Sequence, residues 1–192
     1  MTDDIILCGV GGQGTILASK LLSAAAMRRG LPVKASETIG MAQRGGSVVS
    51  HVRIGDGASS PLIGRGRASM IIAFEPAEAV RNLPYLREGG TVVTSIRPVI
   101  PVTSTLGGPA YELEAILSYL RERVGERLVC VDADAASAEL GSAKCLNVVL
   151  LGAALRAGSL SLDADDVRAC LLELLPERFH ELNLRALDWR PR

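Results

Sequence analysis

Aromatic residues are scarce in this sequence of 192 residues, and neither sign of charge is in excess. Phe, Trp and Tyr together make up 3% of the chain, so it lacks the stacking platforms with which single-strand binders hold nucleic-acid bases. The 21 Lys and Arg residues are balanced by 21 Asp and Glu residues, which leaves no net field to attract nucleic acid or an anionic membrane. We therefore expect no nucleic acid and no membrane among its partners.

Long apolar runs are also absent. The longest, residues 145–157, contains Asn147 and is shorter than the roughly 20 residues that a membrane-spanning helix needs. The N-terminal Met1-Thr2-Asp3-Asp4 is acidic and runs directly into an apolar segment, without the basic region of a secretory signal peptide. We expect a cytoplasmic protein.

The cysteines do not form a metal-binding pattern. Cys8, Cys130, Cys145 and Cys170 include no Cys-x-x-Cys pair, so the spacing of a zinc or iron–sulfur site is missing. We expect no metal ligands, and four buried apolar thiols in a reducing compartment.

Apolar strands alternate with helical patterns along the whole chain. The segment 47–54 alternates apolar and polar residues, which indicates an antiparallel or edge strand. The alternation predicts one domain, residues 1–192, with an α/β fold: a three-layer α/β/α sandwich around a mostly parallel, mixed sheet. The predicted strands are 4–10, 32–38, 47–54, 69–74, 91–95 and 127–132; the predicted helices are 13–27, 75–86, 112–124, 133–140, 145–156, 163–175 and 177–187.

A glycine run joins the first strand to the first helix, in a Rossmann-like arrangement. Its residues are Gly9-Val10-Gly11-Gly12-Gln13-Gly14. Glycines at a helix N-terminus leave backbone N–H groups open to an anion. Glu37, 23 residues after Gly14, stands where a dinucleotide site places its ribose-binding acid, so an NAD(P) site is one interpretation. The other is that these glycines serve only a tight turn.

A second loop, Gln43-Arg44-Gly45-Gly46-Ser47, combines a fixed positive charge, two glycines and a hydroxyl. Because it follows the second strand, it could lie beside the first glycine loop at the carboxyl ends of the strands. The two loops would then form an anion cradle or a rim around a partner's ligand, or Arg44 is simply a solvated loop residue. We interpret His51, His180 and Asn147 as structural, and we assign no catalytic residue.

Several separated motifs together resemble a known family. They are the glycine run 9–14, Ser36-Glu37-Thr38, the loop 43–47, Ser50-His51-Val52-Arg53 and Asn147-x-x-x-Leu151-Gly152. Their order is similar to that in the gamma-type component of 2-oxoacid:ferredoxin oxidoreductases, and in particular of the indolepyruvate type. The likeness covers residues 4–155.

The resemblance implies an enzyme subunit that is inactive alone. The family decarboxylates a 2-oxoacid oxidatively to an acyl-CoA and reduces ferredoxin. Thiamine diphosphate and the 4Fe-4S clusters are held by a large partner subunit, through which ferredoxin is reached. In agreement with a thiamine site on the partner, no Asn-Asn pair follows Gly55-Asp56-Gly57 at the distance expected in a thiamine diphosphate motif. The resemblance associates this domain with coenzyme A and so with Gly9–Gly14 and Gln43–Ser47. A stand-alone NAD(P)-dependent oxidoreductase and a non-catalytic scaffold subunit remain as alternatives.

Overall fold

The computed structural model describes residues 2–37, 45–57, 59–101, 104, 106–108 and 110–191. A six-stranded sheet runs through it in the order β2-β3-β1-β4-β5-β6. The strands β1, β4, β5 and β6 are parallel, and β3 pairs antiparallel with both β1 and β2. The antiparallel strand expected at 47–54 is therefore confirmed. The strands are β1 (Asp3–Val10), β2 (Val33–Glu37), β3 (Ser47–Ile54), β4 (Ala68–Ala73), β5 (Leu86–Ser95) and β6 (Leu128–Val131).

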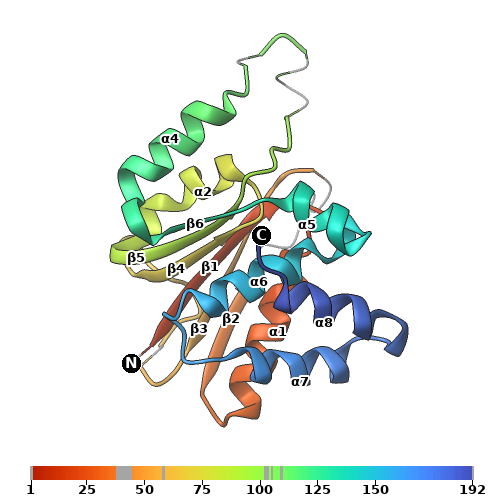
Figure 1. Cartoon of the computed structure of the whole chain (residues 1–192). Coiled ribbons are helices and arrows are strands. Elements are labelled where there is room, and N and C mark those ends of the chain that lie inside the picture. Colours follow the sequence, from red (N-terminus) through yellow and green to blue (C-terminus); the bar gives the residue numbers. More distant parts are fainter. Residues whose placement is uncertain are drawn as a thin grey trace.

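Helices cover both faces of this sheet, which confirms the three-layer α/β/α fold. Figure 1 shows α2 and α4 above the sheet, and α1, α6, α7 and α8 below it. The α-helices are α1 (Thr15–Arg28), α2 (Pro76–Asn82), α4 (Leu113–Val124), α5 (Ala133–Leu140), α6 (Leu146–Arg156), α7 (Ala164–Leu174) and α8 (His180–Asp188). Short 3-10 helices are η2 (Leu83–Tyr85), η3 (Gly125–Arg127), η4 (Ala143–Cys145) and η5 (Glu177–Phe179). None of these described helices is long and apolar enough to cross a membrane.

The strand β4 divides the core into two clusters, because its successive side chains point to opposite faces. Met70 and Ile72 belong to the cluster under α1 and α6, and Ile71 and Ala73 to the cluster under α2 and α4. Both faces of the central strands are thus covered, which explains their continuous apolar sequences.

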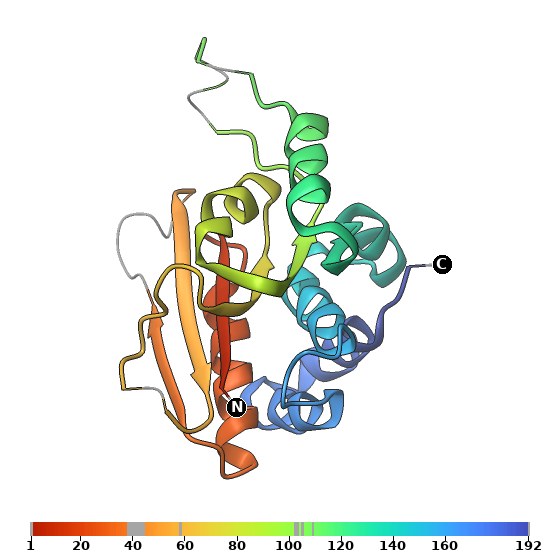
Figure 2. The same cartoon turned by 90° about the vertical axis from the view of Figure 1, so that its left-hand side faces the viewer.

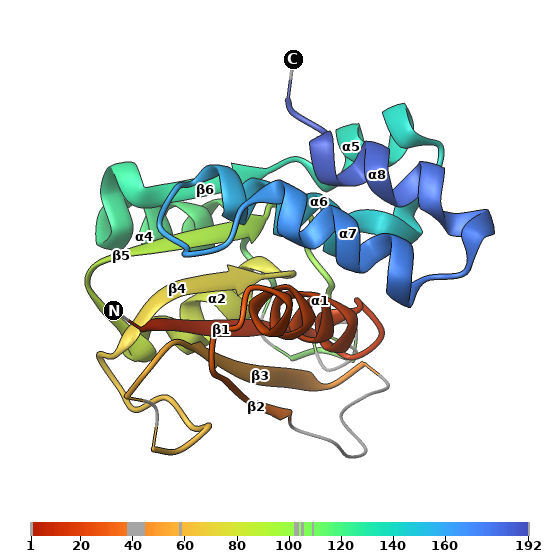
Figure 3. The same ribbon diagram turned by 90° about the horizontal axis from the view of Figure 1, so that it is seen from below.

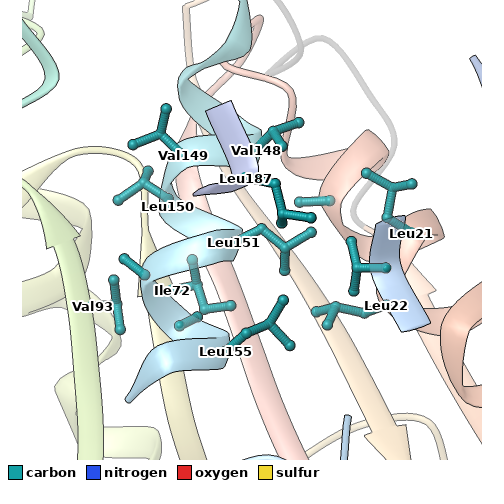
Figure 4. Close-up of a cluster of buried hydrophobic side chains, with 14 of the residues drawn as sticks. Leu21, Leu22, Ile72, Val93, Val148, Val149, Leu150, Leu151, Leu155 and Leu187 are labelled. Atoms are coloured by element: carbon teal, nitrogen blue, oxygen red, sulfur yellow. The ribbon is translucent and has the colours of Figure 1, made fainter. Parts of the chain in front are cut away.

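The helix α6 is buried on nearly every side, because it lies between the sheet and α8 (Figure 3). Its residues Leu150, Leu151 and Leu155 gather with Ile72 of β4 and Val93 of β5 in the larger cluster (Figure 4). A helix that is apolar all round requires such an outer cover, and here α7 and α8 provide it.

The expectation that all four cysteines are buried is wrong for Cys130. Cys8, Cys145 and Cys170 are buried, but Cys130 is exposed. The reason is that β6 is an edge strand: Leu128 packs against the smaller cluster, whereas Cys130 on the same face is left uncovered.

The largest differences between predicted and observed boundaries are in β5 and α2. Gly89 and Gly90, expected as a turn, lie within β5, where a register irregularity against β4 accommodates them. The helix expected over 75–86 ends at Asn82 and continues as η2, because Pro84 cannot donate a helical hydrogen bond.

We predict that Gly152→Ala destabilises the protein by roughly 1–3 kcal/mol or more, because α6 and α8 meet at this glycine. A Cβ atom at Gly152 would lie 2.1 Å from the Leu187 carbonyl oxygen. The measurement is the free energy of unfolding in urea. Gly64→Ala is the matched control, since its Cβ would meet nothing closer than 3.9 Å, and it should change stability by at most about 0.5 kcal/mol. Equal effects of the two substitutions would contradict the packing account.

Candidate functional site

The glycine run lies at the carboxyl end of β1 and leads into α1. Gly12 and Gly14 have φ angles of 101° and 85°, which glycine adopts without strain. Gly14 is the N-cap of α1 and has no side chain to cap the helix. The first backbone N–H groups of α1 therefore have no partner within the helix.

The two predicted loops meet through an extension of the antiparallel β1–β3 ladder. Beyond the register pair Val10–Ser47, the Gly11 N–H donates to the Gly46 carbonyl oxygen at 2.8 Å. The Gly45 N–H donates in return to the Gly11 carbonyl oxygen at 3.4 Å. The expected proximity of the loops is thereby confirmed. Gln43 and Arg44 lie outside the described residues.

A cavity of about 280 Å³ opens where these loops face the first turn of α1. Its wall combines three glycines of the first loop with side chains from α1 and β3. Backbone N–H groups at the positive end of a helix favour an anion here. Sequence reasoning did not select Thr15 and Ile16, although they occupy the first turn of the predicted helix. The lining residues are Gly11, Gly12, Gly14, Thr15, Ile16, Val48 and Ser50.

Gln13 and Gly9 shape this loop rather than line the cavity. The Gln13 side chain folds back, so that its Oε1 accepts from the Val10 N–H at 2.7 Å and its Nε2 donates to the Phe74 carbonyl oxygen at 3.0 Å. A Cβ atom at Gly9 would lie 2.7 Å from that Oε1 atom. Gly9 is therefore required for the brace that Gln13 forms.

Ser47 points to the opposite face of β3 from the cavity, because Val48 and Ser50 occupy the cavity side. Its hydroxyl donates to Glu78 Oε2 at 2.6 Å. Glu78 is only 3% exposed and also pairs with Arg81. Ser47 thus anchors the second loop to α2 and does not face the expected anion cradle.

Sequence reasoning missed this buried acidic cluster. Glu75, 2% exposed, caps α2 and accepts hydrogen bonds from the Glu78 N–H at 3.0 Å and from the Tyr111 hydroxyl. Burial, followed by the hydrogen bond to Glu75, raises the pKa of Tyr111 well above its ordinary value. Burial and then the charge of Glu78 also raise the pKa of the Cys8 thiol, so it stays protonated. The available sequence signal was the position of Glu75 directly before Pro76, because a proline in the first turn marks the start of a helix.

Asn147 supports the glycine run from α6, as the structural interpretation expected. It is 5% exposed, and its Nδ2 donates to the Gly14 carbonyl oxygen at 3.4 Å. Its Oδ1 accepts from the Val148 N–H at 3.0 Å. A Cβ atom at Gly14 would lie 2.6 Å from the Asn147 Nδ2.

The place of Glu37 does not match a dinucleotide site. Glu37 ends β2, and β3 lies between β2 and β1. In the dinucleotide fold the acid follows a strand adjacent to the first, whereas here it stands two strand spacings away, about 10 Å. The geometry therefore disfavours an NAD(P) site built from the glycine run and Glu37.

A second cavity, of about 420 Å³, adjoins the glycine run on its other side. Gly12 and Gln13 line it together with Lys144 and with Arg97, whose Nε lies 3.4 Å from Asp134 Oδ1. Sequence reasoning missed both cations. Arg97 follows β5 directly, so the rule that sites gather at the carboxyl ends of parallel strands was a usable signal.

Comparisons with known proteins show the family of this chain. Residues 4–189 match the family model described as "Pyruvate ferredoxin/flavodoxin oxidoreductase". The chain belongs to this family. The chain is 41% identical to "Indolepyruvate oxidoreductase subunit IorB" of Archaeoglobus fulgidus, over 96% of this chain and 91% of that protein.

Two solved structures share the fold. The keto/oxoacid ferredoxin oxidoreductase gamma subunit from Geobacter sulfurreducens matches with a TM-score of 0.67, at 23% identity, over 96% of this chain and 94% of that one. The 2-oxoglutarate:ferredoxin oxidoreductase from Magnetococcus marinus, solved with 2-oxoglutarate, coenzyme A and succinyl-CoA, matches with a TM-score of 0.68 at 21% identity. It aligns with 97% of this chain, which corresponds to 30% of that longer chain. The expected role as a subunit of a 2-oxoacid:ferredoxin oxidoreductase is confirmed.

The described residues hold no group of three or more His, Cys, Asp or Glu side chains suited to a metal ion. His51 has a structural contact instead: its Nδ1 accepts from the Ile63 N–H at 3.2 Å. Its ring packs edge-on against Tyr85, with centroids 5.9 Å apart. His51 thereby ties the segment after β3 to the sheet.

We predict that stability falls as the pH drops below about 6.5, and that His51 contributes to this fall. Burial lowers the pKa of His51 from its ordinary 6.5, so the unfolded chain binds the proton first. The stabilising effect is present above that pH and is lost as the pH falls toward the folded-state pKa. His51→Asn keeps an acceptor near the Nδ1 position but does not titrate. Urea unfolding at pH 7.5 and 5.5 should show a smaller difference in the variant, and an equal difference would refute this role.

We predict that Gly14→Ala destabilises the protein more than Gly12→Ala. Each substitution costs about 1 kcal/mol or more because of the positive φ angle. Gly14→Ala also forces a contact with Asn147, whereas a Cβ atom at Gly12 meets nothing within 4 Å. Thermal and urea unfolding measure the two costs. Wild-type stability in Gly12→Ala would show that this position does not require glycine.

Proposed function

We propose that this chain is the smaller subunit of an indolepyruvate-type 2-oxoacid:ferredoxin oxidoreductase, which decarboxylates its substrate oxidatively to an acyl-CoA. The observation that carries the proposal is the 41% identity to the indolepyruvate oxidoreductase subunit IorB over nearly the full length of both chains. The partner is a larger subunit that holds thiamine diphosphate and the iron–sulfur clusters and passes electrons to ferredoxin. The absence of a Cys-x-x-Cys pair from this sequence supports that division.

The cavity at the glycine run suits part of coenzyme A. Its volume of about 280 Å³ lies below the roughly 300–1,000 Å³ of pockets that enclose whole drug-sized ligands. It therefore suits one phosphate-bearing portion of the molecule, held by the N–H groups of Gly12, Gly14 and Thr15. When bound, coenzyme A supplies the thiol that accepts the acyl group.

The chain's own residues hold and orient this anion. The Gly11–Gly46 pairing fixes the second loop beside the first, and the Gln13 brace fixes the shape of the first loop. Arg44, next to Gly45, adds a fixed positive charge to the same cradle in this proposal. Beyond Gly12, Lys144 and the Asp134-paired Arg97 line the neighbouring cavity and add cations near the loop. The preference for an anion thus comes from backbone dipoles and cations together.

Co-expression with the large thiamine-binding subunit tests the proposed function. The pair should reduce ferredoxin or viologen with indolepyruvate and coenzyme A, whereas neither subunit should do so alone. A large subunit with full activity by itself would contradict the proposal.

Arg44→Ala, measured in the same complex, tests the cradle. The apparent KM for coenzyme A should rise about tenfold, the scale of one charge-assisted hydrogen bond, with kcat and stability nearly unchanged. Arg65→Ala, which removes an exposed arginine outside the two glycine loops, is the matched control and should leave KM unchanged. A wild-type KM for both coenzyme A and the oxoacid in Arg44→Ala would reject a binding role and favour a scaffold subunit.

A further inference from the structure

A third cavity lies at the other end of the sheet from the glycine run. It has a volume of about 630 Å³ and opens at the amino ends of β5 and β6, between the end of α2 and the end of α4. Between its edge at Gly90 and the carboxyl end of β5 at Ser95, the strand rises by about 17 Å. This cavity, here called the arginine groove, is lined by Val80, Leu83, Pro84, Leu86, Arg87, Glu88, Gly89, Gly90, Tyr119, Arg123, Val124 and Arg127.

Three arginines from three different elements line the arginine groove. Arg87 comes from β5, Arg123 from α4 and Arg127 from η3. Across the described part of the chain, no carboxylate lies within 4.0 Å of any of the three. Arginines elsewhere, such as Arg53 with Asp4, do form ion pairs. Glu88 is the single carboxylate among the lining residues, which leaves an excess of two positive charges.

The groove is held in shape by contacts within the chain. The Arg123 guanidinium lies 5.2 Å from the centroid of the Tyr119 ring, one helical turn away, in a cation–π contact. Gly89 has a φ of 68°, and a Cβ atom there would lie 3.8 Å from the Arg127 Cζ, so the glycine leaves room beside that guanidinium. Arginine presents a planar fork that matches a carboxylate at two points.

The floor of the groove is apolar. Val80, Leu83, Leu86 and Val124 line it, and all four pack only partly buried against the smaller core cluster. Their remaining surface can accept an apolar side chain. The rim and the floor together match an apolar residue flanked by carboxylates.

We propose that the arginine groove docks an acidic segment of the larger subunit, which inserts one apolar side chain onto the floor and sets its carboxylates against Arg87, Arg123 and Arg127. The inference rests on the proposed function, because it takes the partner from it. Charge complementarity is the reason for this occupant: three guanidiniums without a carboxylate partner gain most from acidic side chains brought by another chain. Docking at this end leaves the cavity at the glycine run free.

The test is the affinity of the purified large subunit for an Arg123→Glu/Arg127→Glu double variant at two salt concentrations. The dissociation constant should rise at least about tenfold, and its salt dependence should shrink, because two ion pairs become repulsive contacts. The matched control is Arg178→Glu/Arg190→Glu, which reverses the same charge at two exposed positions in the C-terminal segment that is remote from the groove. It should change the dissociation constant by no more than about twofold.

Two further measurements test the same docking surface. Arg123→Gln/Arg127→Gln, a milder pair, should show the same direction of effect if charge reversal prevents folding. A photoreactive phenylalanine analogue at position 119 should cross-link to a segment of the large subunit that contains at least two carboxylates.

Equal affinity and equal salt dependence of the charge-reversal and control variants would overturn the docking proposal. So would binding of free citrate to the groove, lost in Arg123→Glu/Arg127→Glu, if the affinity for the large subunit stayed at the wild-type value. If the wild-type chain restores activity and the charge-reversal variant binds the large subunit equally well, only the docking proposal is overturned. If the wild-type chain neither binds the large subunit nor restores activity, the proposed function is overturned as well.

Discussion

The antiparallel pairing of β3 with β1 is the interaction on which the candidate site depends. Because β3 runs back along β1, its first residue stands beside the last residue of β1, and the loops that precede and follow these residues must meet. The hydrogen bonds between Gly11 and Gly46 and between Gly45 and Gly11 are the continuation of that ladder. The same insertion moves β2 to the edge of the sheet (Figure 2). One pairing therefore creates the two-loop cavity and separates Glu37 from it.

The two faces of β3 have different roles in the candidate site. On the α1 side, Val48 and Ser50 line the cavity together with the glycines of the first loop. On the α2 side, Ser47 is fixed to the buried Glu78, and Glu75 binds the Tyr111 hydroxyl and the Val99 N–H. A buried carboxylate is costly unless hydrogen bonds satisfy it, and here the Ser47 and Tyr111 hydroxyls and a backbone N–H supply them. The α2 face of β3 thus anchors the strand, and its α1 face lines the cavity.

Most elements could be predicted from the sequence because their signals are local. The helix 133–140 and the strand 47–54 have the predicted boundaries, since capping residues and alternation define them. Strand order is not local, and the position of β3 between β1 and β2 could not be read from either segment. Cys130 shows the same limit: an apolar strand sequence does not tell whether the strand is central or at an edge. In the candidate site, the sequence pointed to Gly11, Gly12 and Gly14, because a site made of backbone N–H groups requires glycines and these can be read from the sequence. Glu78 and Lys144 were missed because only tertiary contacts bring them to the loops.

In the proposed function, this subunit contributes to the enzyme by positioning a ligand and a partner. Here the carboxyl ends of the parallel strands carry the glycine loops, where the N-terminus of α1 favours anions. The amino ends carry the arginine groove, whose positive charge comes from side chains and not from backbone dipoles. The backbone site is built into the fold, since it needs only the β1–β3 ladder and a helix N-terminus. The groove depends on three individual arginines, each replaceable without loss of the core. A partner surface can thus change through these side chains while the cavity at the glycine run keeps its shape.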